Sequence, residues 1–380
     1  MSGDNRNITI DFIKGAAIIL MVMGHALADW PQGGGLRGFI GMFHMPVFFI
    51  ASGYFFRGDR LFSLGDVRRY IGKKVLRLYL PYVFWTLVFL MLHNLFIKWN
   101  IYTDNIALNQ FVKGELSNAK SAIGIEEGFQ NILWTAIMVY RPEPMLACWF
   151  LKALLFITVG YSVVEFTSRR LSYNATIVQS FVALVLLVLY RYHPKVPFDA
   201  LIFHCGGSGA FYGYFFFHLG RVLNERKINF EINSVWVSAS MVFVSVSLLI
   251  AAMYLSSGIR MHRISEALYL PIFVSSALVG WILLCEVANV SHGVGVLISY
   301  IGRNTMPILL FHFLAFKLVN YIGTLYYSHP AFVTAGFPAS YHSWTWTLVY
   351  TLVGVALPLM ASRSYSRIKD FVRGLTCKMR

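Results

Sequence analysis

The sequence predicts an all-α integral membrane protein, a bundle of about ten transmembrane helices with both termini in the cytoplasm. Of the 380 residues, 57% are hydrophobic and only 13% are charged, whereas a soluble domain carries about 25% charged residues. The apolar residues come in runs near the roughly 20 residues that cross a bilayer as a helix. Backbone groups at that depth find no water, so a helix satisfies them, and these runs lack the alternation of a membrane-spanning strand.

We expect one membrane domain over residues 1–380, with no cleavable signal peptide and no further domain. Ten spans are expected at residues 10–29, 39–56, 79–98, 147–166, 175–190, 207–223, 235–255, 266–286, 305–325 and 345–362. The longest interruption is the outer loop 99–146. Long loops in compact folds are binding loops, lids or disordered segments, so this loop is either a partly helical cap over the outer mouth or a spacer.

The formal net charge of +15 has a topological explanation. With the N-terminus in the cytoplasm, most basic residues fall on the cytoplasmic side, which is the positive-inside pattern of membrane proteins. An even number of spans then returns the C-terminus to the same side. The charge therefore points to a lipid bilayer and not to nucleic acid.

The four cysteines show no CxxC pair and no metal-ligand spacing, so no metal is expected. They are Cys148, Cys205, Cys285 and Cys377. Cys148 and Cys205 both fall near the predicted outer face, and the sequence leaves open whether they pair.

The first predicted span carries three ionisable residues, Asp11, Lys14 and His25. Eleven residues turn a helix by about 1100°, close to whole turns, so Lys14 and His25 share one face about 16 Å apart. Asp11 can pair with Lys14 at i,i+3. Charged groups inside a bilayer usually mark function. The alternative is a lysine that snorkels to the inner boundary and a histidine that only packs.

The second predicted span begins with Phe43-His44-Met45-Pro46 and continues to Ser52. His44 approaches His25 if the two spans form an antiparallel hairpin. Two imidazoles facing one cavity suit proton abstraction near neutral pH, and a metal site is the weaker interpretation because no cysteine or carboxylate joins them. Ser52 is a candidate nucleophile, although a serine beside glycine in a membrane helix more often packs.

A basic segment precedes the third predicted span. Its five cations are Arg68, Arg69, Lys73, Lys74 and Arg77. Such a segment either anchors the chain to anionic lipid or clamps the phosphates of a large anionic cofactor. Charge alone favours anchoring.

Together these elements resemble acyltransferase family 3, ten-helix membrane acyltransferases that modify bacterial surface glycans and related molecules. That family begins with an arginine, ten residues and then a histidine, and Lys14 and His25 have this spacing. Lys14 stands where most of the family has arginine, and this replacement, together with the Phe43–Pro46 element, resembles the fucose 4-O-acetylase-like branch. Lys74 and Arg77 resemble the cytoplasmic Arg-x-x-Arg motif, with lysine in its first place.

Two further elements match the family more weakly, Trp149 at the start of the fourth span and the intramembrane His312. The resemblance extends over essentially the whole chain. Its two arginine-to-lysine departures bear on phosphate binding, because lysine cannot make the bidentate contact that arginine makes.

The resemblance implies transfer of an acyl group, acetyl in the first instance, from cytoplasmic acetyl-CoA to a carbohydrate hydroxyl at a bacterial inner membrane. The acceptor would be a surface polysaccharide or a lipid-linked sugar. His25 would be the general base and His44 would orient or stabilise the developing charge. The cofactor-binding residues would be Lys14, Arg68, Arg69, Lys74 and Arg77. Supporting residues would be Asp11, Ser52, Trp149 and His312.

A transporter or flippase of a glycan or small solute is the main alternative, because intramembrane His and Lys also mark substrate and proton paths. The sequence shows no inverted repeat and no paired interrupted helices, which favours the enzyme. A scaffold without chemistry would leave the buried polar groups unexplained.

Overall fold

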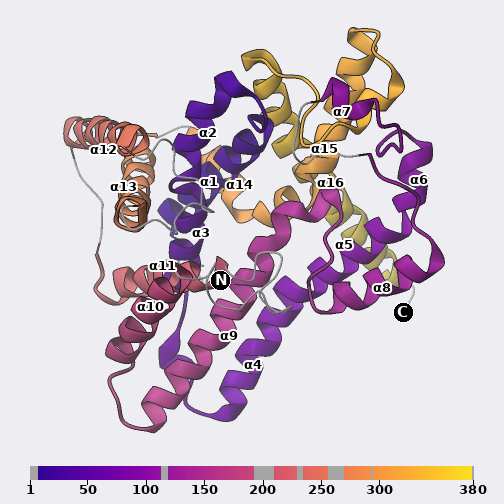
Figure 1. Ribbon diagram of the computed structural model, residues 1–380. Coiled ribbons are helices and arrows are strands. Elements are labelled where there is room, and N and C mark those ends of the chain that lie inside the picture. Colours follow the sequence, from indigo (N-terminus) through magenta and orange to yellow (C-terminus); the bar gives the residue numbers. More distant parts are fainter. Residues whose placement is uncertain are drawn as a thin grey trace.

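The computed structural model describes residues 7–112, 119–191, 209–228, 234–255, 269–291 and 294–378. Within these ranges all regular elements are helices, which confirms the predicted all-α class (Figure 1). The helices are α1 (Ile8–Ala26), α2 (Gly34–Gly41), α3 (His44–Tyr54), α4 (Leu64–Lys74), α5 (Leu80–Met91), α6 (His93–Lys98), α7 (Leu108–Phe111), α8 (Ile125–Ala136), α9 (Trp149–Arg170), α10 (Ala175–Arg191), α11 (Gly209–Glu225), α12 (Val235–Leu255), α13 (Tyr269–Val290), α14 (Val294–Arg303), α15 (Thr305–Tyr326) and α16 (Trp344–Lys378).

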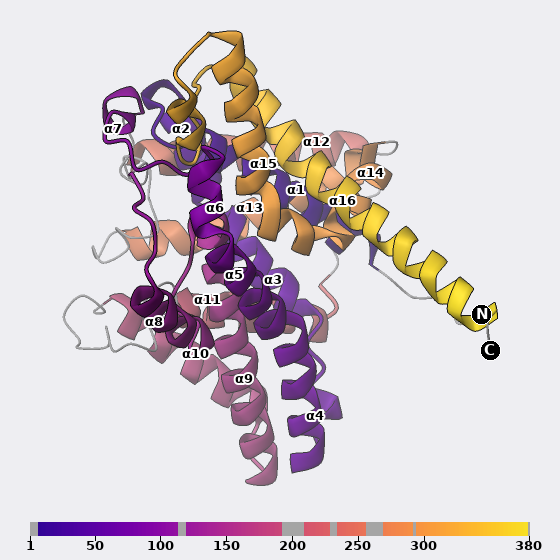
Figure 2. The same ribbon diagram turned by 90° about the vertical axis from the view of Figure 1, so that its right-hand side faces the viewer.

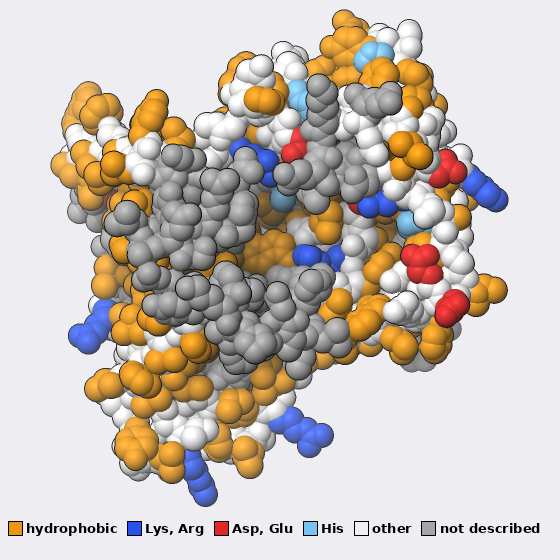
Figure 3. All heavy atoms as spheres, viewed as in Figure 1, with side chains coloured by type: hydrophobic (Ala, Val, Ile, Leu, Met, Phe, Trp, Pro, Cys, Tyr) orange, Lys and Arg blue, Asp and Glu red, His pale blue; other side chains and the backbone are white. Residues whose placement is uncertain are grey.

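Eight helical stretches of the described chain are long and apolar enough to cross a membrane. They lie at Ile8–Ala26, Pro31–Arg60, Leu64–Met91, Glu143–Arg170, Val235–Leu255, Leu270–Val290, Thr305–Tyr326 and Trp344–Tyr365. The predicted spans 175–190 and 207–223 coincide with the shorter helices α10 and α11. Hydrophobic side chains also cover much of the periphery (Figure 3). The chain is therefore a multi-pass membrane protein, while ten spans and cytoplasmic termini stay predictions.

Helix α1 lies at the centre of the bundle and contacts α3, α13, α14, α15 and α16 (Figures 1 and 2). The backbones of α1 and α14 touch: a Cβ atom at Gly302 would overlap the carbonyl oxygen of Asp11, and one at Gly15 would overlap that of Ile298. Because these neighbours are backbone atoms, they cannot swing aside. The two glycines therefore fix the end of α1 that carries Asp11.

Replacing Gly302 by alanine is expected to destabilise the bundle by about 1–3 kcal/mol, the usual effect of overpacking a closely packed contact. Thermal unfolding of the purified protein in detergent measures this change. Gly295→Ala on the same helix is the matched control, because the nearest atom to its Cβ would be 3.9 Å away on the Phe12 ring. Equal melting temperatures for the two variants would contradict the role of the close contact.

The predicted second span, 39–56, consists of two helices, α2 and α3, with a break at Met42 and Phe43. Pro46 accounts for the break, because proline lacks the N–H that a helix interior needs and is tolerated only in the first turn. His44 is consequently the first residue of α3. The predicted span 39–56 lies inside the apolar stretch Pro31–Arg60, and the break within it places His44 at a helix start.

The third span begins earlier than predicted: one helical run extends from Leu64 through α4, a π-helical turn at Val75–Tyr79 and α5. Pro81 explains the π turn, because its ring would clash with the carbonyl four residues back, at Arg77. The N–H of Leu80 bonds instead to the carbonyl of Val75. The span also ends earlier, since Leu92 separates α5 from α6. The π-helical turn is of interest because such turns inside α-helices often occur at functional sites.

The predicted outer loop 99–146 contains the helices α7 and α8, and residues 113–118 lie outside the described part. It folds back along the third span: the hydroxyl of Tyr79 donates to the carbonyl of Ala136 and that of Tyr82 to the carbonyl of Tyr140, both at 2.7 Å. The loop is therefore packed against the side of the third span, and its position as a cap over the outer mouth stays a prediction.

The sequence left open whether Cys148 and Cys205 form a disulfide. Cys148 is a buried free thiol, as is Cys285. Cys205 lies outside the described residues.

Candidate functional site

The N-terminal half of α1 carries the predicted ion pair. Lys14 Nζ lies 2.7 Å from Asp11 Oδ1, and the lysine side chain is about one quarter exposed. Its amine also lies 5.8 Å from the centre of the Phe55 ring, beyond the end of α3. Lys14 is thus partly neutralised by Asp11 and keeps one side open.

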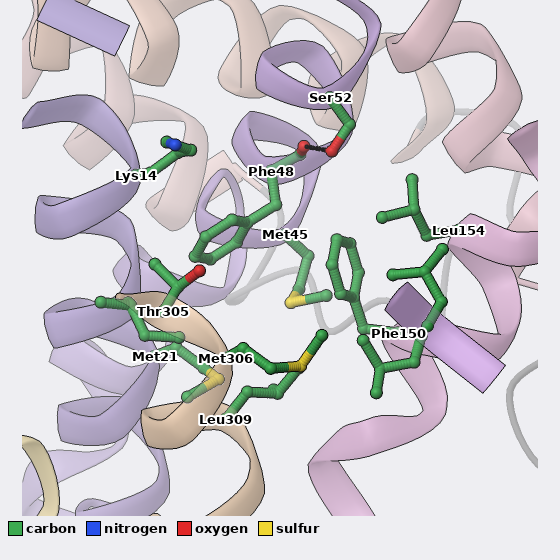
Figure 4. Close-up of a pocket in the computed structure, with 13 residues that line it drawn as sticks. Lys14, Met21, Met45, Phe48, Ser52, Phe150, Leu154, Thr305, Met306 and Leu309 are labelled. Carbon is green, nitrogen blue, oxygen red and sulfur yellow. Dashed lines mark hydrogen bonds between the residues drawn. The ribbon is translucent and has the colours of Figure 1, made fainter. Parts of the chain in front are cut away.

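Lys14 lies at one end of a cavity of about 160 Å³ between α1, α3, the π turn, α9 and α15 (Figure 4). The lining residues are Lys14, Ile18, Met21, Met45, Phe48, Ser52, Leu78, Phe150, Leu151, Leu154, Thr305, Met306 and Leu309. Apart from Lys14, Ser52 and Thr305 the walls are apolar. Methionine side chains adapt to irregular shapes, and three of them line the cavity, so it suits a slim and flexible chain.

Three imidazoles gather beyond the far end of this cavity. The rings of His25 on α1 and His312 on α15 stack with centroids 5.4 Å apart, and Phe313 packs edge-on against His25 at 4.8 Å. His44 lies within electrostatic range of His25, as does Arg37. The structure therefore brings His25 and His44 together and adds His312, which the sequence had offered only as a supporting residue.

The tautomers of two of these histidines follow from their hydrogen bonds. His44 Nδ1 lies 2.8 Å from the carbonyl oxygen of Ile40, and His312 Nδ1 lies 2.9 Å from that of Ile308. A carbonyl only accepts, so each Nδ1 carries the hydrogen and each Nε2 keeps a lone pair. His312 Nε2 is buried and has no hydrogen-bond partner. The cluster therefore offers free nitrogen lone pairs that can accept a proton.

The cavity and the imidazoles are one helical turn apart. Met21 precedes His25 by four residues and Leu309 precedes His312 by three, spacings that place side chains on one face of a helix. Both residues line the cavity. The cavity therefore extends from Lys14 to the turn below the stacked histidines, along the face that helical periodicity predicted.

The basic segment directly precedes one wall residue of the cavity in the sequence. Leu78 lines the wall, and Arg77 directly precedes it. Lys74 lies one turn earlier, with its amine 5.2 Å from the centre of the Tyr70 ring. Arg68 and Arg69 are exposed on α4, farther from Leu78 in the same helical run, and Arg69 lies 3.9 Å from Asp66. None of these four residues lines the cavity; Lys74 and Arg77 are the two that lie closest in sequence to its wall residue Leu78.

Ser52 and Trp149 occupy packing positions. The Ser52 hydroxyl donates to the carbonyl oxygen of Phe48 at 2.8 Å while lining the cavity (Figure 4). That bond to its own helix favours the packing interpretation over a nucleophile. Trp149 lies against Gly209 at the start of α11, where a Cβ would approach the indole to 2.6 Å. Its neighbour Phe150, rather than Trp149, lines the cavity.

A buried ionic network between α9, α10 and α11 was not anticipated. Glu165 is fully buried and pairs with Arg221, which is 2% exposed. Arg169 and Gln179 donate to the same carboxylate at 2.8 and 3.3 Å. The sequence did contain a signal, because Glu165 falls inside the predicted span 147–166 and an intramembrane carboxylate requires a partner.

A metal site needs several ligating side chains close together. Across the described ranges, His, Cys, Asp and Glu side chains do not gather in groups of three that could hold a metal ion.

Comparison with known proteins gives a match to one family over most of the chain and matches to two relatives over short segments. Residues 7–363 match the family described as "Acyltransferase domain". The chain is 38% identical over 89 residues to nodulation protein NolL of Sinorhizobium fredii, and 36% identical over 93 residues to NolL of Mesorhizobium japonicum. These segments cover 22% of this chain and 24% and 23% of the two relatives. No solved structure matches the chain.

Proposed function

The chain belongs to this acyltransferase family, and on that premise we propose that it transfers an acetyl group from cytoplasmic acetyl-CoA to a carbohydrate hydroxyl at a bacterial inner membrane. The observation that carries the proposal is the cavity between Lys14 and the stacked imidazoles of His25 and His312. Lys14 lies at one end of it, the proton acceptors lie one helical turn beyond the other, and Arg77 directly precedes the wall residue Leu78 in the sequence. A nucleotide thioester, with its charged head and long apolar arm, has the same order of parts.

The charged head of the donor would bind at Lys74 and Arg77. Both residues lie within one turn of Leu78 on the cavity wall, and cations form strong charge-assisted hydrogen bonds with phosphate. Lys14 offers a further cation inside the entrance, about 16 Å along α1 from His25. The pantetheine arm would follow the methionine-lined wall, which leaves the thioester beside the histidines.

The chemistry assigned to the histidines is a direct acyl transfer. His25 accepts the proton of the acceptor hydroxyl as its oxygen attacks the thioester carbonyl. The new C–O bond forms, the C–S bond breaks, and the departing thiolate takes up the proton to leave free coenzyme A. His44 and His312 keep their Nδ1 hydrogens on backbone carbonyls, so their Nε2 atoms can orient the hydroxyl or the protonated His25.

Binding of acetyl-CoA is expected to stabilise the purified protein and to depend on Arg77. A ligand at one hundred times its dissociation constant stabilises the folded state by about 2.7 kcal/mol. Thermal unfolding in detergent, with and without acetyl-CoA, measures the shift, and Arg77→Gln should reduce it.

Arg170→Gln is the matched control, because Arg170 is likewise an exposed cation but lies at the opposite end of α9 from the cavity residue Phe150. It should keep the full shift. Equal stabilisation of Arg77→Gln and the unmodified protein would remove Arg77 from the donor site. A protein that ignores acetyl-CoA and responds to a transported solute would instead be a transporter.

A further inference from the structure

A second cavity, polar and larger, lies between α6, the outer loop and the 3₁₀ turn Glu143–Cys148. Its volume is about 390 Å³, which is within the range of small-molecule sites. The lining residues are His93, Tyr102, Ala119, Lys120, Ser121, Ile123, Glu127, Tyr140, Arg141, Pro142, Glu143 and Leu146. The acyl-transfer chemistry proposed above uses none of them.

Three polar atoms of this lining are buried without a hydrogen-bond partner among the described residues: Tyr102 Oη, Arg141 Nε and Glu143 Oε2, of which the last forms an ion pair with Lys317. Tyr102 is only 2% exposed. An unsatisfied buried donor is unfavourable for folding, so such atoms in a cavity wall suggest a ligand that satisfies them. Burial raises the pKa of Tyr102, with Glu143 adding to the shift, and raises that of Tyr140 to about 12. Both phenols therefore stay protonated donors at neutral pH.

The charges of the lining balance. Glu127 and Glu143 supply two carboxylates, and Lys120 and Arg141 supply two cations, with Lys120 3.8 Å from Glu143. A formally neutral wall does not select an anionic or a cationic ligand. Phenol donors, carboxylate acceptors and the adjoining rings of Tyr102 and His93, 5.0 Å apart, match the hydroxyls and the apolar faces of a neutral sugar.

A short chain of contacts connects this cavity to the histidine cluster. Glu143 pairs with Lys317 of α15 at 3.1 Å, and the Lys317 amine lies 5.5 Å from the centre of the Phe337 ring. Phe337 packs against Phe313 at 4.8 Å, and Phe313 packs against His25 at 4.8 Å. Two aromatic rings thus separate the cavity edge from the proposed base, so a group bound in the cavity is not itself the group that reacts.

We infer that this cavity is a recognition subsite for a neutral sugar unit adjacent to the one that is acylated. The inference rests on the proposed function and deepens it: the acceptor is a glycan of more than one unit, held by the outer loop while a neighbouring hydroxyl reaches His25. The predicted cap over the outer mouth would then bind the acceptor glycan.

The test measures acceptor and donor kinetics separately. The full-length protein is reconstituted in lipid vesicles with labelled acetyl-CoA and with surface glycan purified from a strain lacking this protein. Tyr102→Phe removes only a hydroxyl that has no hydrogen-bond partner among the described residues, so a structural role predicts no loss. Glu127→Gln removes one lining charge, and Glu126→Gln, a neighbour outside the lining, is its control.

Tyr102→Phe and Glu127→Gln are each expected to raise the KM for glycan about fivefold or more, as the loss of one net hydrogen bond does. The KM for acetyl-CoA and kcat should stay within about twofold, the size of minor effects on binding. An unchanged glycan KM in both variants, or an equal rise in Glu126→Gln, would overturn the subsite while transfer itself continues. If the unmodified protein transfers no label to glycan, the proposed function fails first, and the two failures are distinguishable.

Discussion

Replacement of His25 by alanine is expected to abolish acyl transfer while the protein still inserts into the membrane. His25 lies in the last turn of α1, stacked on His312 and one turn beyond the cavity residue Met21. Removal of a positioned general base typically lowers the rate by about 10²–10⁴-fold. The remaining imidazoles cannot replace it fully, because a general base must lie within hydrogen-bond reach of the hydroxyl, and the bonds from Nδ1 of His44 and His312 to backbone carbonyls hold these rings in their own positions.

The assay compares acetyl transfer at equal amounts of purified protein, with acetyl-CoA stabilisation as a check on the donor site. His329→Ala is the control, because this histidine stacks on Tyr327 and Tyr341 in the connection between α15 and α16 and is not part of the cluster. It should keep near-normal activity. Residual transfer above a tenth of the unmodified rate in His25→Ala would show that His25 is not the base.

The helices were predictable from the sequence because a span is set by a local run of apolar residues. The structure departs from the predicted spans where a single residue changes the local helix geometry. Pro46 divides the second span and Pro81 widens the third, and hydropathy is insensitive to both. Helix α14 was missed for a different reason: at ten residues it is too short to register as a span, and its position depends on contact with α1 at Gly302.

In the candidate site, the relation between residues on one helix was predictable from the sequence, and the contact between two different helices was not. Lys14 and His25 share a helix, so their common face follows from the 100° turn per residue, and the cavity does begin at Lys14. His312 lies on a different helix, far along the chain, and its stacking on His25 depends on how α1 and α15 pack. The sequence could identify it as an intramembrane imidazole but could not assign its partner.

The second large effect expected is on stability: Glu165→Ala should lower the free energy of unfolding by about 3–5 kcal/mol, the usual loss when one partner of a buried ion pair is removed. Arg221 donates from Nη1 to Glu165 Oε2 and from Nη2 to Oε1, the latter at 2.9 Å. Without the carboxylate, a guanidinium that is 2% exposed loses its main counterion. Equilibrium unfolding in mixed detergent micelles measures the loss.

Two comparisons separate this mechanism from a general sensitivity of the region. Glu225→Ala removes a second carboxylate bonded to Arg221, at 2.7 Å, but its side chain is 41% exposed, and exposed pairs contribute about 1 kcal/mol or less. The double variant Glu165→Gln with Arg221→Met replaces the pair by groups without net charge, and such replacements are often neutral or stabilising. It should therefore recover much of the stability that Glu165→Ala loses. If the double variant is as unstable as the single one, the network is held by packing, and the uncompensated charge of Arg221 is not the cause.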